Sequence, residues 1–124
     1  MAKLEGSLLE NFTATSTVPE LQIIDTVIGE GAEAPKGATV TAHYTGAITA
    51  TGVIFQSSHD MGQPITFPLS GVIAGWQQGV PGMKVGGKRR LVIPAAMAYG
   101  AASPAPNIPA NSDLVFDIEL TDVR

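Results

Sequence analysis

The strongest pattern in this 124-residue chain is an alternation of apolar and polar positions near its carboxyl end. Leu114, Phe116, Ile118 and Leu120 occupy every second position, and mostly charged residues stand between them. Successive side chains of a β-strand point to opposite faces of the sheet. The range 114–121 is therefore predicted to form an antiparallel strand with one face in the core and the other in water.

Shorter stretches rich in β-branched and aromatic residues, separated by glycine and proline, predict further strands. In the range 39–44, Val40, Ala42 and Tyr44 fall on one face and the threonines on the other. The range 46–52 is interpreted as a hairpin connection because glycine stands at both of its ends. The predicted strands are 21–28, 39–44, 53–55, 65–67 and 91–93.

A helical pattern is found in the range 72–80. Val72, Ile73, Trp76 and Val80 form one apolar stripe, and the glycines and proline that follow would end the helix. Several strands and one short apolar-striped helix are typical of an α+β domain. The predicted fold is an antiparallel sheet of five to six strands wrapped around one short α-helix.

Residues 1–19 are interpreted as a tail, and residues 20–124 as the domain. The four-residue spacing of Leu4, Leu8 and Phe12 predicts a frayed tail or a short docking helix, with a partner-binding helix as the alternative. This segment lacks the basic start, apolar stretch and cleavage site of a secretory signal. Since the chain also has no 18-residue apolar run, we expect a cytoplasmic protein with no membrane partner.

The composition removes most kinds of catalytic chemistry. The chain has no cysteine, and Asp60 is the one carboxylate between positions 34 and 112. The chain has two histidines. His43 lies on the face opposite Tyr44, where a hydrogen-bonded or exposed ring is expected. His59 could be half of a metal or acid–base site. No other half is visible in the sequence, so we expect no metal, no cofactor and no proton transfer.

Two basic motifs do not predict a phosphate-binding or nucleic-acid-binding site. The range 82–88 matches the phosphate-loop pattern G-x-x-x-x-G-K, but Arg89 replaces the hydroxyl residue and a strand is predicted where a helix is needed. Four of the seven basic residues lie between Lys84 and Arg90, with no aromatic residue among them. We interpret them as the solvated, charged edge of a strand. With a net charge of −4, no nucleic-acid partner is expected.

The aromatic residues allow two interpretations. The chain has one tryptophan, two tyrosines and four phenylalanines, and all of them except Phe12 lie inside the predicted domain. They could form an ordinary core, or they could line an apolar pocket that would use nearly all of them.

Six short motifs occur in order and at compatible spacing. They are HYTG (43–46), FQSS (55–58), VIAGW (72–76), MKVGGKR (83–89), AYG (98–100) and LVFDIEL (114–120). With these motifs, the chain resembles the FKBP-type peptidyl-prolyl cis-trans isomerases, the tacrolimus-binding immunophilin family. The resemblance covers approximately the range from Leu21 to Val123.

This resemblance implies an antiparallel sheet around a short helix, with a pocket between them in which the bond preceding proline rotates. It implies Pro-containing polypeptides and tacrolimus-type macrolides as ligands of a monomer that assists protein folding. The residues expected to act on the substrate are Tyr44, Phe55, Gln56, Tyr99 and Phe116. Those expected to bind it are Ile65, Phe67, Val72, Ile73, Trp76 and Ile108, with Trp76 as the floor.

Gln56 is the departure from the family pattern with the largest expected consequence, because the family usually has a pocket aspartate there. A binding module for Pro-containing segments, with weak or no turnover, is therefore the alternative to an active isomerase. The connection 100–112 is too short for the chaperone domain that some bacterial relatives insert near it. The other departures are Met61 for arginine, Ile65 for an aromatic residue, Gly71 for glutamate, Pro104 for histidine and Asn107 for isoleucine.

Overall fold

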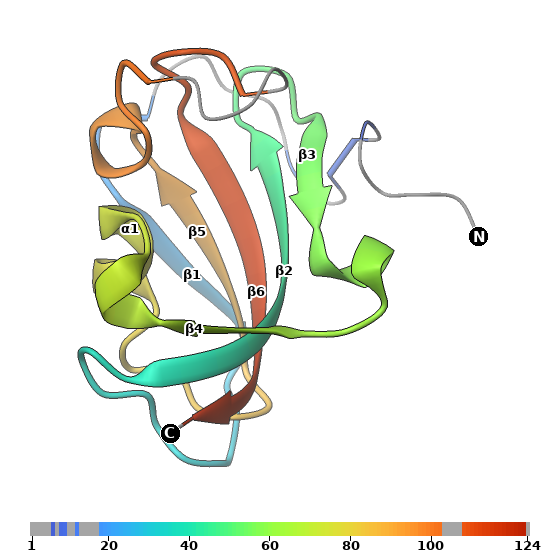
Figure 1. The fold of residues 1–124 in the computed structure, drawn as a ribbon, viewed down its shortest axis with the longest axis vertical. Coiled ribbons are helices and arrows are strands. Elements are labelled where there is room, and N and C mark those ends of the chain that lie inside the picture. The colour runs from blue at the N-terminus through green and yellow to red at the C-terminus, as the bar shows by residue number, and fades with distance from the viewer. Residues whose placement is uncertain (1–5, 7, 10–11, 13–17, 103–107, 124) are drawn as a thin grey trace.

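The computed structural model describes residues 6, 8–9, 12, 18–102 and 108–123. Its main element is a six-stranded antiparallel sheet with the order β1-β5-β6-β2-β3, in which β4 also pairs with β2 (Figure 1). The strands are β1 (Gln22–Val27), β2 (Thr39–Ile48), β3 (Ile54–Ser57), β4 (Ile65–Pro68), β5 (Lys88–Ile93) and β6 (Leu114–Val123). The helices in the described ranges are α1 (Ala74–Gly79) and the 3₁₀ helices η1 (Ser58–Met61), η2 (Leu69–Gly71) and η3 (Ala95–Met97). The predicted fold class is confirmed.

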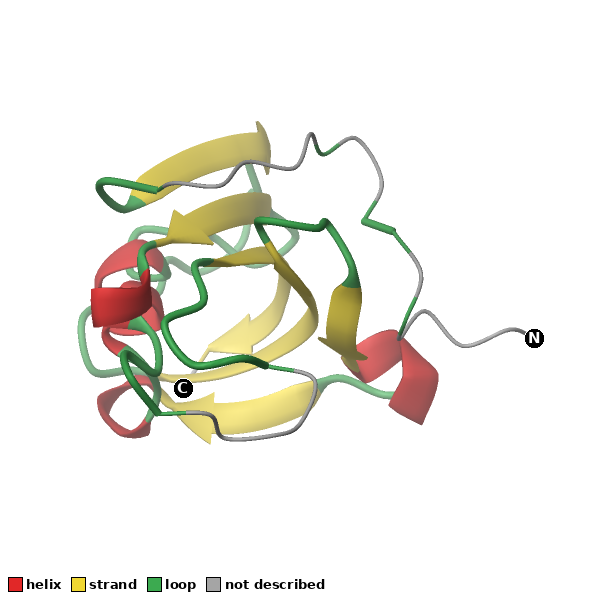
Figure 2. Cartoon of the chain, turned by 90° about the horizontal axis from the view of Figure 1, so that it is seen from above, coloured by secondary structure: helices red, strands yellow, loops and turns green. Residues whose placement is uncertain are grey.

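The helix α1 covers one face of the curved sheet, which we call the inner face (Figure 2). It lies unusually close to β5, because a Cβ added to Gly75 would be 2.6 Å from the side chain of Ile93, and one added to Gly79 would be 2.6 Å from Leu91. Two glycines four residues apart share one helix face and let it approach the strand. This close approach presses Trp76, the residue after Gly75, against the sheet.

The central strands β2 and β6 follow the predicted alternation. Tyr44 pairs with Ile118, and Gly46 pairs with Phe116. The interpretation of 46–52 as a connection is wrong in its first half, because β2 continues to Ile48 and the turn begins only at Thr49. Pairing with β6 extends β2 through Gly46. The local sequence does not predict this extension, because glycine does not favour a strand.

The other face of the sheet, the outer face, is not wholly open to water. Val115 is fully buried, so the expectation of a solvated second face for the last strand is wrong at this position. It packs with Val92 in a second apolar cluster that includes Leu9 and Val18 from the N-terminal segment. Sequence periodicity could not show this cover, because the covering residues lie about a hundred positions away.

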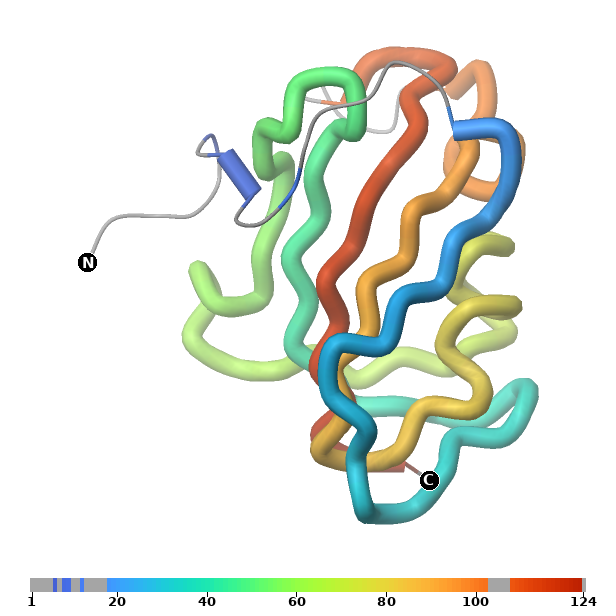
Figure 3. Tube along the Cα trace, turned by 180° about the vertical axis from the view of Figure 1, so that it is seen from behind, coloured from blue at the N-terminus to red at the C-terminus, as the bar shows by residue number. Residues whose placement is uncertain are grey.

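Within the residues that the structure describes, the N-terminal segment pairs with the residues that lead into β3. Leu8 forms an isolated bridge with Val53, and the Leu9 N–H donates to the Gly52 carbonyl at 2.8 Å. Figure 3 shows the described residues at the start of this segment, drawn in blue, beside β3 from behind the sheet. None of the described residues before β1 is helical, whereas Leu4 lies outside the described residues. The domain boundary at residue 19 stays a prediction.

The basic run does not form a strand edge. Its second half is β5, which lies between β1 and β6. Arg89 pairs with Asp25 on β1, and Arg90 pairs with Asp117 on β6, each with an Nε–Oδ1 distance of 2.6 Å. The prediction failed because strand order depends on distant partners.

No helix in the described ranges is long and apolar enough to cross a bilayer.

Candidate functional site: an aromatic cavity

An aromatic cavity of about 270 Å³ lies between the inner face of the sheet and the segment that leads into α1. Four strands, this segment, α1 and the loop after η3 each contribute to its walls. Its lining residues are Tyr44, Phe55, Gln56, Phe67, Gly71, Val72, Ile73, Trp76, Tyr99 and Phe116. Every one of them except Gly71 belongs to the set predicted from the sequence.

Trp76 forms the centre of the inner wall. Its ring makes edge-to-face contacts with three other rings, at centroid distances of 5.5 Å to Tyr44, 5.1 Å to Phe67 and 5.4 Å to Phe116. Phe55 meets Phe116 in the same way at 5.7 Å. Such contacts fix ring orientation as well as position. With only 4% of its surface exposed, Trp76 is the rigid floor of the cavity.

Gly46 makes room for two of these rings. A Cβ at this position would lie 2.6 Å from Cζ of Phe55 and 2.7 Å from Cε1 of Phe116. Both distances are far below normal van der Waals contact, so only glycine lets the two rings lie over β2. Sequence reasoning placed Gly46 in a motif and did not recognise this role, because a close approach depends on the register of β2 against β6.

The outer rim of the cavity is more exposed and more polar. Tyr99 is 38% exposed, and no ring contact is recorded for it among the described residues. The Gln56 side chain is also exposed, beside the buried Phe55. Burial, and after it the neighbouring Tyr99, raises the pKa of the Tyr44 hydroxyl above its ordinary value of 10.0. Among the described residues, the polar groups that line the cavity are all neutral, and they lie mainly at its rim.

The main chain of Val72 and Ile73 adds a donor. The Val72 carbonyl accepts from Nε2 of Gln77 at 2.7 Å, and the Ile73 carbonyl accepts from the N–H groups of Trp76 and Gln77. The Ile73 N–H has no acceptor in the part of the chain that the structure describes. The segment is thus held by its carbonyls, while this N–H stays available to a ligand.

Two of the predicted binding residues do not line the cavity. Ile65 is half-buried on β4, where it pairs with Ala42 and packs against the core. Ile108 is buried in the same core. Their roles toward a substrate stay predictions, and Pro104 and Asn107 lie outside the described residues.

Ser58 holds the main chain of Tyr44 by a hydrogen bond, and the sequence did not predict this role. It is fully buried, its Oγ accepts from the Tyr44 N–H at 2.8 Å, and it lies 2.8 Å from Nδ1 of His43. The expectation of a hydrogen-bonded His43 is confirmed. His59 stacks on His43 at 4.3 Å. Within the described ranges, no group of three potential metal ligands occurs.

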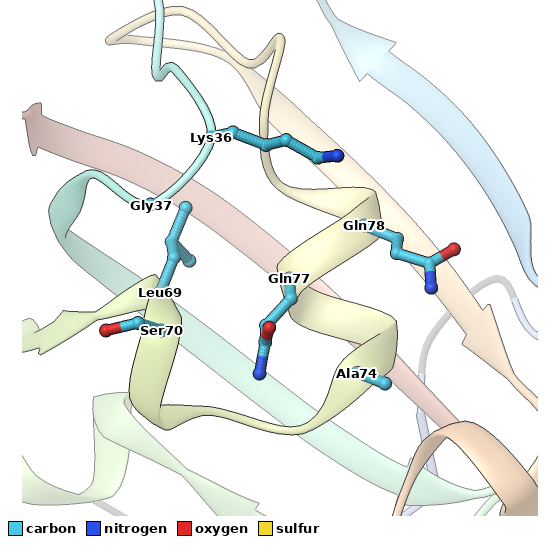
Figure 4. Close-up of a pocket in the computed structure, with 7 residues that line it drawn as sticks. All are labelled: Lys36, Gly37, Leu69, Ser70, Ala74, Gln77 and Gln78. Atoms are coloured by element: carbon cyan, nitrogen blue, oxygen red, sulfur yellow. The ribbon is translucent and has the colours of Figure 1, made fainter.

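A second cavity, of about 450 Å³, lies between α1, η2 and the loop before β2 (Figure 4). Its polar groups come from Lys36, Ser70, Gln77 and Gln78, and none of its described lining residues is aromatic. Long, exposed side chains lose much of their conformational freedom when they bind a ligand. The aromatic cavity, whose walls are already fixed, is therefore the better candidate site.

Comparisons with known proteins agree with this geometry. The chain matches the model of the FKBP-type peptidyl-prolyl cis-trans isomerases over residues 30–121. A probable FK506-binding protein of Corynebacterium glutamicum is 50% identical over 101 residues, which cover 82% of this chain and 85% of that protein. The peptidyl-prolyl cis-trans isomerase FPR2 of Saccharomyces cerevisiae is 49% identical over 94 residues, with coverages of 74% and 70%.

Solved structures show the same architecture. AtFKBP13 superposes with a TM-score of 0.73 at 40% identity, covering 84% of this chain and 93% of that one. FkpA from Escherichia coli gives a TM-score of 0.77 at 40% identity, with coverages of 94% and 53%. The shared fold and the named relatives therefore define an isomerase of the peptide bond before proline. The chain belongs to the FKBP-type peptidyl-prolyl cis-trans isomerase family.

Proposed function

We propose that the aromatic cavity is the site where this isomerase rotates X–Pro bonds in polypeptide substrates. The observation that carries the proposal is a buried Trp76 surrounded by edge-to-face rings, with hydrogen-bond donors near the rim. In this arrangement the proline ring would lie on Trp76, and the preceding peptide bond would lie among the rings.

An apolar cavity lowers the barrier because of the electronic structure of the amide. Amide resonance gives rotation a barrier of about 18–20 kcal/mol, and X–Pro bonds therefore take roughly tens to hundreds of seconds to isomerise. Reaching milliseconds requires about 10⁴–10⁵-fold acceleration, or roughly 5–7 kcal/mol. The planar amide is more dipolar than the twisted one, so water stabilises the ground state. Excluding water removes that stabilisation, and walls that fit the twisted amide add binding energy in the transition state.

The donors at the rim act on the neighbours of the rotating bond. A strong hydrogen bond to the rotating carbonyl would stabilise the resonance form and slow the reaction. The Ile73 N–H and the Tyr99 hydroxyl are therefore assigned to adjacent substrate carbonyls, which they hold in place while the central bond turns. No nucleophile and no proton transfer are needed.

Gln56 distinguishes this site from the usual family pattern. Its amide can donate and accept hydrogen bonds, but it carries no negative charge at the rim. The proposal is that Gln56 supports turnover at a rate below that of an aspartate-containing site. The alternative, a module that binds Pro-containing segments without turning them over, differs from the proposal in rate and not in binding.

A protease-coupled assay on an X–Pro peptide separates these possibilities. Faster cis-to-trans conversion, abolished by tacrolimus, is the expected result, and Lys36→Ala in the second cavity should leave it unchanged. An uncatalysed rate with quenching of Trp76 fluorescence by the drug would indicate the binding module. An uncatalysed rate without quenching would mean that the aromatic residues only pack.

Three further properties are proposals of the same kind. Tacrolimus-type macrolides would occupy the aromatic cavity because it is apolar and its walls are in place before a ligand binds. The sequence favours a monomer located in the cytoplasm. Sedimentation of the purified protein and fractionation of cells that produce it test the last two.

A further inference from the structure

Asp113 joins three distant segments of the chain at the end of the sheet nearest the rim. It lies directly before β6, and its Oδ1 accepts from the Ala95 N–H at 2.8 Å. Its Oδ2 accepts from the Val18 N–H at 3.0 Å. Its main-chain carbonyl accepts from the N–H of Thr49 at 3.1 Å and from its hydroxyl at 3.2 Å. The N-terminal segment, the β2–β3 turn and η3 thus meet on a single residue.

The bond to Ala95 bears on the position of Tyr99. The Ala95 carbonyl accepts from the N–H of Ala98 at 3.0 Å and from that of Gly100 at 2.8 Å. The two neighbours of Tyr99 are therefore both tied to Ala95, whose own N–H is held by Asp113. Within the described residues, the Tyr99 ring contacts no other ring that would orient it. The position of its hydroxyl therefore depends on this main-chain geometry.

The bond to Val18 connects the same loop to a rigid part of the molecule. Val18 is 5% exposed and packs in the outer-face cluster with Val92, Val115 and Ile54. Ile54 directly precedes Phe55 in the cavity wall. Hydrogen bonds to a carboxylate are about twice as strong as those between neutral groups. Asp113 therefore anchors the loop that carries Tyr99 to packed strands.

We propose that Asp113 is a positioning residue of the isomerase site, which holds the Tyr99 hydroxyl in place through Ala95 and couples it to the N-terminal segment at Val18. The proposal rests on the function assigned to the aromatic cavity. It extends the functional unit to residues before position 30, where the family match begins.

The test uses the full chain with Asp113→Ala and Asp113→Asn. The alanine removes both carboxylate bonds, whereas the asparagine keeps one acceptor oxygen and should give a smaller effect. Asp25→Asn is the matched control, because its carboxylate also accepts two hydrogen bonds, from Arg89, but does not line the aromatic cavity. All variants are assayed at a temperature at which circular dichroism shows them folded.

A double-mutant cycle with Tyr99→Phe separates positioning from general destabilisation. Asp113→Ala should lower kcat/KM roughly tenfold in the wild-type background, as expected for a displaced contact, and less than about twofold in the Tyr99→Phe background. Asp25→Asn should change it by less than about twofold in both. An equal loss in both backgrounds, or no loss with Asp113→Ala, would overturn the proposal. Should the alanine variant not fold, the asparagine variant is interpreted by the same criterion.

Amide hydrogen exchange gives a readout that does not depend on activity. Exchange at Ala95 and Gly100 should become faster in Asp113→Ala, which removes both carboxylate bonds, while exchange in β2 and β6 stays as in the wild type. Unchanged exchange at both residues would contradict the proposal even if activity fell. A wild-type protein that fails to accelerate X–Pro isomerisation would instead contradict the function of the cavity and leave this local coupling measurable.

Discussion

The inner wall and the outer rim of the aromatic cavity are built in different ways. In the inner wall, Trp76 meets Tyr44 and Phe116 edge to face, Tyr44 and Phe116 meet at a tilt, and all three are almost inaccessible to water. At the rim, Tyr99 and Gln56 are exposed, and Tyr99 is held through its main chain. Side-chain packing therefore fixes one half of the site, and hydrogen bonds between loops fix the other.

In the proposed isomerase site, this difference corresponds to two tasks. Water exclusion requires walls that do not move, and close packing gives those. Capturing and releasing a flexible polypeptide requires groups that can adjust, and loops on a rigid scaffold supply those. Substitutions in the inner wall should therefore abolish activity, whereas substitutions at the rim should modulate it.

The largest effect is expected from Gly46→Ala, which would break the inner wall. The new methyl group overlaps the rings of Phe55 and Phe116, and displacing them should cost about 1–3 kcal/mol of stability and roughly 100-fold in kcat/KM. Thermal unfolding and the protease-coupled assay measure the two quantities. Gly31→Ala is the control, because its Cβ would meet Val85 at 2.6 Å, away from the cavity. Equal activity losses in both variants would contradict the comparison.

A smaller effect is expected at the rim from Tyr99→Phe. It removes one hydroxyl that would hold a substrate carbonyl and should lower kcat/KM roughly tenfold. Because Tyr99 is an exposed residue, the midpoint of thermal unfolding should stay nearly unchanged. A large loss of stability would show that Tyr99 belongs to the packed wall.

Gln56→Asp should sharpen the comparison by restoring a negative charge at the rim. We expect kcat/KM to rise about threefold and tacrolimus to bind more tightly, since bonds to a charged acceptor are stronger. Assay rates and titration of Trp76 fluorescence test both. If neither changes, the rim carboxylate has no function in this chain.

The smallest effect is expected from pH. Since the proposed mechanism transfers no proton, kcat/KM should stay constant from about pH 6 to pH 9, within the limits set by the coupling protease. The pKa of Tyr44 is raised, so the unfolded chain loses this proton first. Its contribution to the free energy of unfolding is therefore intact below the ordinary pKa of 10.0 and declines as the pH rises above it. A bell-shaped profile centred near neutrality would contradict this mechanism.

Most of the inner wall could be predicted from the sequence, and the means of holding the rim could not. The alternation in β6 placed Phe116 correctly, and the apolar stripe predicted over 72–80 placed Trp76, because both patterns depend on local geometry. The predicted helix was too long, since α1 spans only Ala74–Gly79 and Ile73 is its N-cap. The ordered family motifs then gave Tyr44, Phe55 and Tyr99. By contrast, Ser58 and Asp113 act through partners that are distant in sequence or on another strand, and no periodic pattern marks them.

The sequence by itself determined the fold class, the apolar character of the site and the absence of cysteine chemistry. It did so because periodicity, composition and motif order are properties of the chain. Only the tertiary structure decided that β5 is an inner strand, that Val115 is covered by Leu9 and Val18, and that Gly46 must lack a side chain. These features depend on strand order and register, which arise when segments far apart in the sequence pack together.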